Sequence, residues 1–321
     1  MKKGVIWVLA LLFVLSLGPA LAGEKELKAV CFLSKKDPMA AMTVEWVKRI
    51  NEYCRGELRI QYGEGPQGVS AFDEVEALRK GAFQVAFSST GRYESIFPEG
   101  AAFSLSRLAP WEERRPGGFY DFMVERHREI KVMYLGRWLH GSIYLWLKKP
   151  VTGRRELKGR RLGTGPGYDR FLKALGAVPV KVSPTGSSGA QEGGSLEGLV
   201  SPVLGVRRSG WIETCRYAID HPLYNQSCTI LMNLDTWNGF PLALQERIQN
   251  LTAWFEPYMV GYFDSAEKME WGELEKAGID RIHFSPSDAR AYVDTAYRVE
   301  WKALEDRLPD LAPRLKELTE Y

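Results

Sequence analysis

Short apolar runs alternate with segments whose apolar residues recur at helical spacing through the first part of the chain. Residues 27–33 form the first apolar run, and Trp46 and Ile50 then lie four positions apart, on one face of a periodic segment. Continued in this way, the pattern predicts strands over residues 27–33, 58–62 and 83–87 and helices over residues 39–54 and 73–80. Strands that alternate with helices in this order are typical of a parallel sheet with helices packed on it.

A second α/β unit begins near residue 145. After a helix over 119–128 and a strand over 132–138, the pattern predicts strands over residues 143–147, 160–163, 178–182 and 229–233 and helices over residues 168–175 and 211–219. From Leu242 to roughly Lys276 the pattern stays helical, which is long enough to brace two lobes at once. Helices over 288–304 and 312–318 close the chain. We therefore expect an α/β protein with two lobes.

The first 22 residues have the pattern of a secretory signal peptide. Lys2 and Lys3 form a short positive region, an apolar run covers residues 5–17, and Ala20 and Ala22 stand in the small-x-small positions of a cleavage site. We expect cleavage after Ala22 and release of the mature chain into the periplasm. No later segment has the length and apolarity of a membrane-spanning helix.

Charge and composition narrow the classes of partner. The formal net charge is only +3 and the two signs are interleaved, whereas a nucleic-acid-binding surface usually shows a strong basic stripe. We therefore expect no nucleic acid as a partner. Ten Trp and fourteen Tyr mostly fill cores, but some can line a binding cleft. A Gly/Ser-rich patch over residues 186–195 fits either a flexible loop or a close approach of the backbone to a ligand.

Four cysteines permit disulfides in an oxidising compartment. Proximity along the chain favours a Cys215–Cys228 bond and, less strongly, a Cys31–Cys54 bond, but the sequence alone leaves all three pairings open. No metal site is expected, because the spacings are long and no histidine is placed to complete a tetrahedral set.

No catalytic motif stands out in the sequence. The chain has no Gly-x-Ser-x-Gly, no His-Glu-x-x-His and no phosphate-binding Walker loop. The glycine-rich segment 163–167 follows a predicted strand, but Pro166 and the glycine spacing argue against a dinucleotide site. None of the four histidines has a nucleophile at motif spacing. We therefore predict a protein that is not an enzyme and needs no cofactor.

Several phrases, taken in order, carry a family resemblance. They are Cys-Arg-Gly-Glu-Leu-Arg-Ile at 54–60, the segment 76–86, Gly91-Arg92-Tyr93 with Phe97-Pro98-Glu99, the segments 157–162 and 171–180, and Met232-Asn233, Trp237 and Pro241. Together they resemble the DctP-type solute receptors of tripartite ATP-independent periplasmic (TRAP) transporters. The resemblance implies a periplasmic-binding-protein fold: two α/β lobes around a ligand cleft, joined by crossing strands and a long bracing helix.

The resemblance also implies a function and a division of the chain. Such a receptor closes like a clamshell on a small organic solute and delivers it to the membrane subunits of a TRAP permease. Lobe I would then comprise residues 23–142 with about 226–270, and lobe II residues 143–225 with about 271–321. The alternative is a periplasmic sensor or scaffold subunit with the same fold that no longer delivers solute.

The chain departs from the family where most members grip a carboxylate. The arginine that ends the phrase Leu-Lys-Gly-x-x-x-Arg is replaced by Gly163, and a second family arginine falls on Ile143. Since a buried carboxylate needs a cationic partner, either Arg92 or Arg161 takes over, or the solute is neutral, aromatic or only weakly anionic. Arg92 fits a cleft position or an interlobe salt bridge, and Arg161 fits a replacement anchor or the surface.

The residues predicted from the resemblance to bind the solute lie at or near cleft-facing positions of such receptors. They are Ser70, Ser89, Arg92, Trp138, Tyr144, Arg161, Ser201 and Trp211.

Overall fold

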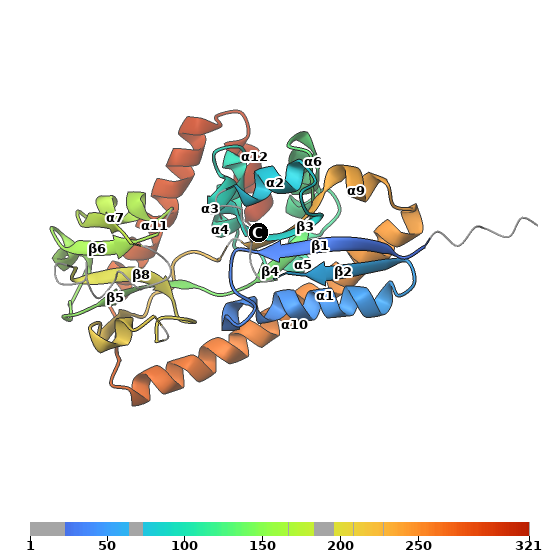
Figure 1. The fold of residues 1–321 in the computed structure, drawn as a ribbon. Coiled ribbons are helices and arrows are strands. Elements are labelled where there is room, and N and C mark those ends of the chain that lie inside the picture. Colours follow the sequence, from blue (N-terminus) through green and yellow to red (C-terminus); the bar gives the residue numbers. More distant parts are fainter. Residues whose placement is uncertain are drawn as a thin grey trace, which may run out of the picture.

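The computed structural model of the 321-residue chain describes residues 23–63, 73–165, 167–182, 196–207, 209–226 and 228–320. It has two lobes, each built on its own sheet, with one long helix running beneath both (Figure 1). The predicted two-lobed α/β fold with a bracing helix is therefore confirmed. The predicted signal peptide lies outside the described residues, and among those residues no helix is long and apolar enough to cross a membrane.

The sheet of the first lobe has five strands in the order β2-β1-β3-β10-β4. β1 runs parallel to β2 and β3, whereas β10 is antiparallel to both β3 and β4. The strands are β1 (Lys25–Cys31), β2 (Leu58–Tyr62), β3 (Val85–Ser89), β4 (Val132–Leu139) and β10 (Cys228–Asn233). Every residue of β4 and β10 is buried, because these two strands have the core on both faces.

Helices cover the first sheet on both sides. They are η1 (Pro38–Ala40), α1 (Ala41–Tyr53), α2 (Glu74–Arg79), α3 (Thr90–Tyr93), η2 (Pro98–Ala101), α4 (Ala102–Leu105), α5 (Pro110–Glu113), α6 (Phe119–Glu129) and α9 (Leu234–Asn238). α1 buries Trp46 and Ile50 on the face that the helical spacing predicted. The ring of Trp46 meets the edge of Phe87 on β3, with centroids 5.6 Å apart, so helix and sheet share one core.

The sheet of the second lobe has six strands in the order β11-β9-β5-β8-β6-β7. They are β5 (Ile143–Leu147), β6 (Arg161–Thr164), β7 (Val178–Lys181), β8 (Gly198–Pro202), β9 (Tyr217–Ile219) and β11 (Asp280–Ile282). The helical segments beside this sheet are η3 (Arg154–Leu157), α7 (Asp169–Ala174) and η4 (Trp211–Glu213).

The sequence prediction was wrong in one stretch of this lobe. The helix predicted over 211–219 is a single 3-10 turn, η4, followed by strand β9. Residues 217–219 pair with β11 on one side and β5 on the other, and these hydrogen bonds outweigh the local helical pattern. The pattern also missed β8, which starts at a glycine and ends at a proline. Gly198 is required there because a Cβ atom would lie 2.1 Å from the Trp146 carbonyl oxygen.

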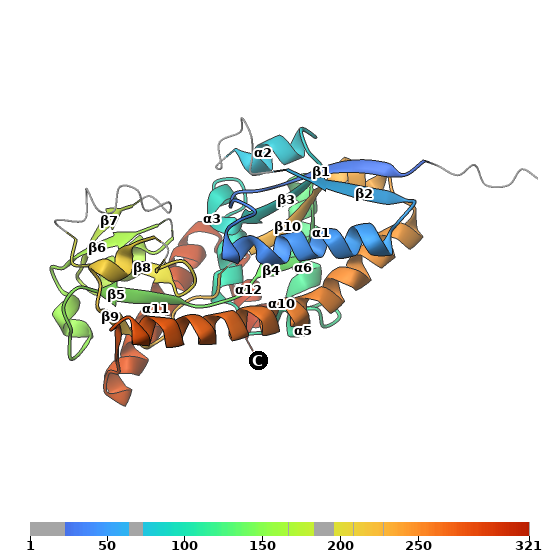
Figure 2. The same cartoon turned by 60° about the horizontal axis from the view of Figure 1, so that its bottom comes forward.

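The chain passes between the lobes four times. The segments after β4 and before β10 lie side by side, where Ser142 bridges to Asn225 and the Gln226 amide donates to the Gly141 carbonyl at 3.0 Å. The helix α10 (Leu242–Lys276) then returns to the second lobe beneath both (Figures 1 and 2). The helix α11 (Pro286–Arg307) contacts α7 and η3 of the second lobe and η2 and α4 of the first.

The last helix, α12 (Ala312–Thr319), packs on α4 and α6 of the first lobe. The sequence-based division assigns this segment to the second lobe, so these contacts favour moving it to the first. The rest of that division stays a prediction.

The four cysteines are buried free thiols, so the predicted Cys215–Cys228 bond is absent. Cys215 packs in the second lobe beside Trp146 and Leu274, whereas Cys228 begins β10 in the core of the first lobe. The weaker candidate, Cys31–Cys54, is also unformed. Cys31 ends β1, while Cys54 follows α1 at the opposite end of that strand, beside the start of β2. Nearness along the chain did not predict nearness in space.

Candidate functional site

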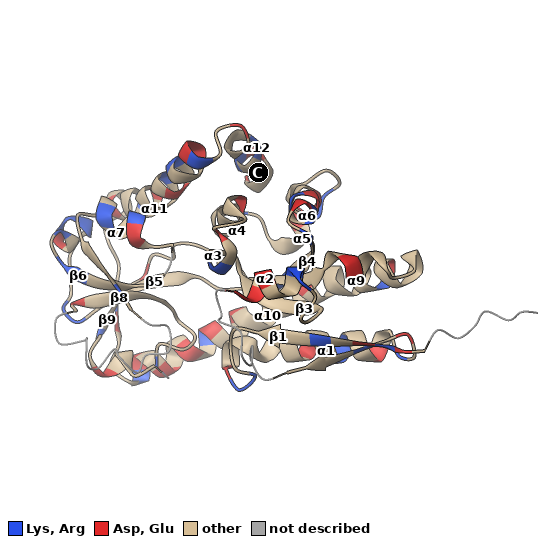
Figure 3. Cartoon of the chain, turned by 45° about the horizontal axis from the view of Figure 1, so that its top comes forward, with Lys and Arg blue, Asp and Glu red and all other residues tan. Residues whose placement is uncertain are grey.

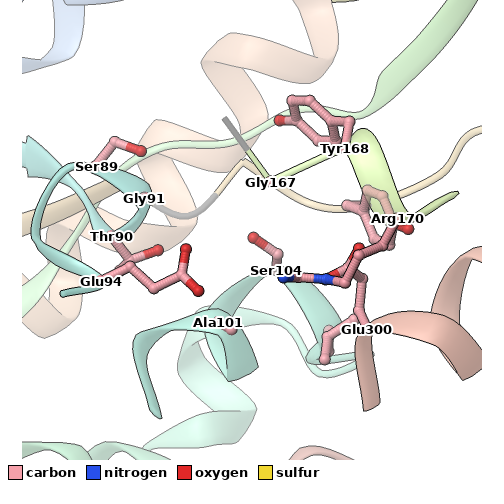
Figure 4. A pocket seen from close by; sticks show the side chains of 12 residues that line it. Ser89, Thr90, Gly91, Glu94, Ala101, Ser104, Gly167, Tyr168, Arg170 and Glu300 are labelled. Carbon is pink, nitrogen blue, oxygen red and sulfur yellow. The ribbon is translucent and has the colours of Figure 1, made fainter. Parts of the chain in front are cut away.

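A small hollow, partly open to solvent, lies between the two lobes. The first lobe contributes the end of β3, α3 and α4, and the second contributes the start of α7 and Tyr224; Glu300 comes from α11. In Figure 4, Ser89, Thr90 and Glu94 face Tyr168, Arg170 and Glu300, with Ser104 between them. A cavity lined from both lobes is where lobe closure would enclose a solute.

The charged groups of the hollow are arranged as ion pairs. Arg170 donates from Nε to Oε2 of Glu300 at 2.7 Å, and its Nη2 lies 2.5 Å from the same oxygen. On the other wall, Arg307 of α11 donates to the Glu94 carboxylate at 3.1 Å and to the Glu94 carbonyl oxygen at 3.0 Å. The cation that lines the described part of the hollow is therefore already neutralised.

The second oxygen of Glu300 is left without a donor among the described residues. Oε1 is buried and accepts no hydrogen bond. Burial raises the pKa of Glu300, and the hydrogen bond from Arg170 opposes that rise. Burial lowers the pKa of Arg170, but the bond to Glu300 outweighs it, so the pKa of the guanidinium is raised overall. Among the described residues that line the hollow, the one arginine is thus held by a carboxylate.

Two tyrosines form an aromatic wall. The rings of Tyr168 and Tyr224 stack with centroids 5.8 Å apart and planes inclined by 24°. The Tyr224 hydroxyl donates to the Ala296 carbonyl of α11 at 3.0 Å, which fixes that ring. Hydroxyls of Ser89, Thr90 and Ser104 complete the lining.

The predicted residues of the first lobe divide into two groups. Ser89 lines the hollow. Arg92, on the same turn, lies half-buried with its guanidinium 4.1 Å from the centroid of Phe32. Its charge lowers the pKa of the buried Glu74 carboxyl, but desolvation is the larger effect and raises that pKa to about 8. Arg92 is thus placed near the cleft side of β3, beside a buried acid.

Trp138 does not line the hollow. Its ring is completely buried, lies edge-on to Phe87 with centroids 6.2 Å apart, and donates from Nε1 to the Ser88 carbonyl at 3.3 Å. It supports β3 from within the core, and its role in solute binding stays a prediction. Ser70 lies outside the described residues.

The predicted residues of the second lobe gather around an aromatic cluster. Tyr144 and Ser201 are paired across β5 and β8, and Trp211 is buried nearby. Trp146 and Trp271 stack at the centre of this cluster, with centroids 5.4 Å apart. Tyr144 donates its hydroxyl to Glu267 of α10 at 3.1 Å, so it joins the sheet to the bracing helix. Arg161 is exposed at the far end of β6, which favours the surface reading of that residue.

Gly163 stands in an apolar, close-packed place. A Cβ atom there would lie 3.2 Å from side-chain atoms of Leu199 and Val182 and 3.4 Å from Leu196. The position that carries an arginine in the resembling receptors is therefore filled by neighbouring apolar side chains. An arginine would have to displace them.

The sequence did not point to six residues that line the hollow: Glu94, Ser104, Tyr168, Arg170, Tyr224 and Glu300. For Tyr168 and Arg170 a signal existed, because they follow a glycine-rich loop at the carboxyl end of a predicted strand, where open α/β sheets bind ligands. For Glu300 no local signal existed, since it lies in the middle of an amphipathic helix.

Two α/β lobes with a hollow between them are the architecture of a two-lobed solute-binding protein. Residues 30–306 match the family model described as bacterial extracellular solute-binding protein, family 7, the DctP family. The chain belongs to that family. The prediction of a DctP-type receptor, a class that serves TRAP transporters by capturing small solutes, is thereby confirmed.

Solved structures with the same fold are TRAP periplasmic solute-binding proteins. One from Desulfovibrio salexigens, with bound orotic acid, is 18% identical with a TM-score of 0.79 over 92% of this chain and 97% of its own. One from Ochrobactrum anthropi is 17% identical with a TM-score of 0.78, covering 92% and 96%. One from Haemophilus influenzae, with bound L-gulonate, is 16% identical with a TM-score of 0.75, covering 92% and 99%. Because these sequence identities are low, the comparison with the solved structures shows a shared fold and nothing more.

Proposed function

We propose that this receptor captures its solute in the hollow between Ser89 and Tyr168 and passes it unchanged to a TRAP permease. The observation that carries the proposal is the lining of that hollow by both lobes and by α11. A solute that contacts all three stabilises the closed form relative to the open one, and this difference in affinity shifts the population. The mature receptor would begin at Gly23 and work in the periplasm.

We further propose that the solute is neutral, aromatic or only weakly anionic. A side chain at Gly163 would press on Leu199 and Val182, and Arg170 is held by Glu300. The lining instead offers hydroxyls, stacked tyrosines and the Glu300 carboxylate. These groups suit a solute with an aromatic or apolar face and hydrogen-bond donors. The solutes named for the structural neighbours, orotic acid and L-gulonate, are acids, so this chain would differ from those proteins.

No turnover is expected at this site. Its carboxylates, Glu94 and Glu300, are engaged by Arg307 and Arg170. A sensor or scaffold role on the same fold is the second candidate, and the filled arginine position at Gly163 is the observation that favours it.

The test is a thermal-shift screen of residues 23–321 against orotate, L-gulonate, neutral polyols and neutral aromatic solutes. A solute at 100 times its dissociation constant adds about 2.7 kcal/mol, which raises the melting temperature by several degrees. We expect hits among the neutral or aromatic solutes, and we expect Tyr168→Ala to abolish them. Tyr53→Ala, at an exposed site on α1, is the matched control.

A hit with simple carboxylates alone would contradict the proposed solute class. Binding that survives Tyr168→Ala unchanged would contradict the proposed site. No hit in the whole panel would favour the sensor or scaffold role.

A further inference from the structure

One short segment of the second lobe is far more basic than the rest of the chain. Seven of the fourteen residues 148–161 are Lys or Arg, and Glu156 is the one acidic residue among them. The whole chain has a net charge of only +3, so the residues outside this segment are together net negative. Positive charge is therefore concentrated here, although the two signs are interleaved along most of the chain.

The fold places this segment at the outer end of the second sheet, away from the crossing between the lobes. β5 begins at Ile143, directly after the crossing, and ends at Leu147, so Lys149 lies beyond its far end. β6 runs from Arg161 to Thr164, and residues shortly after it line the hollow. Arg161 therefore also lies at the end of the sheet that faces away from the hollow. Figure 3 shows Lys and Arg in blue at this end, around β6 and α7.

Hydrogen bonds bring the basic residues of different elements together at this end. Arg160 donates from Nη1 to the Lys149 carbonyl oxygen at 3.5 Å, so the start of β6 lies beside the end of β5. The Gly159 amide donates to the Gly176 carbonyl oxygen at 2.8 Å, which places the last turn of α7, with Lys173, beside the link between η3 and β6. We call six of these side chains the basic edge: Lys149, Arg155, Lys158, Arg160, Arg161 and Lys173.

The basic edge faces solvent and lacks acidic partners. Five of its six side chains are exposed, and Arg160 is half-buried. Among the described residues, no carboxylate lies within ion-pair distance of any of the six, whereas the neighbouring Arg154 is paired with Asp288 at 3.0 Å. Like charges held close together repel one another, so an anionic surface that approaches this edge gains favourable interactions without breaking existing ion pairs.

We propose that the basic edge docks the receptor on a membrane surface that contains anionic phospholipids. Lys and Arg side chains are attracted to anionic headgroups through their charge, and this attraction needs no fixed binding geometry. The edge fits this mode, because its cations are spread over the end of β5, η3, β6 and α7 instead of converging on one point. A DctP-type receptor serves a transporter in the membrane, so such a surface lies where the receptor works.

Docking at this end leaves the solute site accessible. The hollow lies beyond the carboxyl end of β6, at Gly167 and Tyr168, whereas the basic edge includes the first residue of the same strand. A receptor held at its outer end diffuses along the membrane in two dimensions, which raises its local concentration near a membrane partner. The inference goes beyond the proposed function, and its test needs no solute.

Flotation of residues 23–321 with protein-free vesicles tests the proposal. The vesicles consist of phosphatidylcholine alone or of phosphatidylcholine with about one-third phosphatidylglycerol, which is anionic. We expect binding to the anionic vesicles and none to the neutral ones. Raising the salt from about 0.01 to about 0.15 M shortens the Debye length from about 30 to about 8 Å, and we expect it to lower the bound fraction at least about fivefold.

Lys158→Glu combined with Arg161→Glu makes the edge far less basic, and we expect it to lower the bound fraction at low salt at least about tenfold. The milder pair Lys158→Gln and Arg161→Gln should give a smaller loss in the same direction. The matched control, Lys48→Glu with Arg55→Glu, changes the net charge as much as the first pair at exposed sites of the first lobe and should keep most of the binding.

Absence of binding to the anionic vesicles at low salt would overturn the proposal. An equal loss in the two glutamate pairs would overturn it as well, because net charge alone would then account for the binding. Binding only to vesicles that also contain a membrane protein would assign the basic edge to that protein and reject the lipid surface.

Discussion

The two lobes differ in how they are joined to α10: the first uses buried ion pairs and the second uses aromatic packing. In the first lobe, the buried Arg137 guanidinium meets Glu113 at 2.5 Å, and Arg114 meets Glu256 of α10 at the same distance. Glu256 also accepts the backbone amide of Arg137 at 2.9 Å, so one carboxylate ties β4 to the bracing helix. These charges are paired inside the lobe.

The second lobe joins the same helix through aromatic packing. Trp271 of α10 stacks on Trp146 of β5 and meets Tyr144 edge to face. The Arg281 guanidinium, 4.4 Å from the ring centroid of Trp271, covers this cluster and is paired with Asp220 at 2.6 Å. Acidic and basic residues are interspersed along the helices of both lobes (Figure 3), so the contrast concerns the interior.

This contrast between the lobes accounts for the absence of the family arginine at Gly163. In the first lobe the buried Arg114–Glu256 pair fastens α10, whereas in the second lobe apolar side chains surround Gly163, the position of the missing arginine. Under the proposed function, solute recognition uses the hydroxyls and tyrosines that line the hollow between the lobes. Four substitutions test this contrast between the lobes.

The largest effect is expected from Glu256→Ala. It leaves the buried guanidinium of Arg114 without its carboxylate and should lower the free energy of unfolding by about 3–5 kcal/mol in urea titrations. Glu273→Ala removes a surface partner of Lys276 on the same helix and should change it by less than about 0.5 kcal/mol. Equal losses in both variants would show that the buried pair does not anchor the helix.

Gly163→Arg tests whether the family anchor can be restored. The Cβ contacts with Leu199 and Val182 predict overpacking that lowers the free energy of unfolding by about 1–3 kcal/mol. We expect no gain in orotate affinity by calorimetry. Gly165→Arg, where a Cβ meets nothing within 4 Å, is the control and should be nearly neutral. Tight orotate binding by the Gly163 variant would mean that the apolar filling is incidental.

The pH dependence of stability reports on the buried Glu74. Its pKa is raised from 4.5 to about 8, chiefly by desolvation, so the folded chain holds a proton that the unfolded chain releases. Its contribution is complete below pH 4.5 and is lost as pH rises to about 8, with a slope of up to about 1.4 kcal/mol per pH unit.

Glu74→Gln should flatten that slope between pH 6.5 and 8.5, measured by urea unfolding at each pH. The buried His127, whose pKa is lowered from 6.5 to about 3 mainly by burial, is neutral in the folded chain but still binds protons in the unfolded chain near pH 6.5; this contribution is the same in the parent and the variant and cancels in their difference. Glu76→Gln, on the exposed side of α2, should leave the slope unchanged. An identical profile in the Glu74 variant would refute this assignment.

The smallest effect is expected from Tyr144→Phe, which removes the hydroxyl that donates to Glu267. Losing one hydrogen bond to a partly buried carboxylate should lower the free energy of unfolding by about 1 kcal/mol. Tyr53→Phe, on the exposed face of α1, is the control. Equal free energies of unfolding in the two variants would show that ring packing alone joins the sheet of the second lobe to α10.

The sequence predicted those elements whose own residues determine them. The spacing of apolar residues predicts a helix directly, because that spacing alone decides which face is buried. This holds for Trp46 and Ile50 on α1 and for the long periodic segment that forms α10. β9 could not be predicted in the same way, since residues 217–219 become a strand only through pairing with β5 and β11. The predicted disulfide failed for the same reason, because Cys215 and Cys228 are near in sequence but belong to different lobes.

The candidate site was predicted in part. Ser89 follows from the bend after β3, a local feature, whereas Tyr224 and Glu300 reach the hollow from segments far along the chain. Trp138 lies in a strand buried on both faces, and such a strand gives no alternation to show which side chain faces the cleft.

The four crossings between the lobes limit how the receptor can move. A body held by one tether can tilt, twist and slide, whereas two bridged segments and two helices restrict these motions and favour a hinge-like opening and closing coordinate. The affinity for a solute then depends on the free-energy difference between the open and the closed form along that coordinate. A change in the stiffness of any crossing, whether at Gly141 or along α11, would rescale the affinity for every solute by the same factor while leaving their rank order intact.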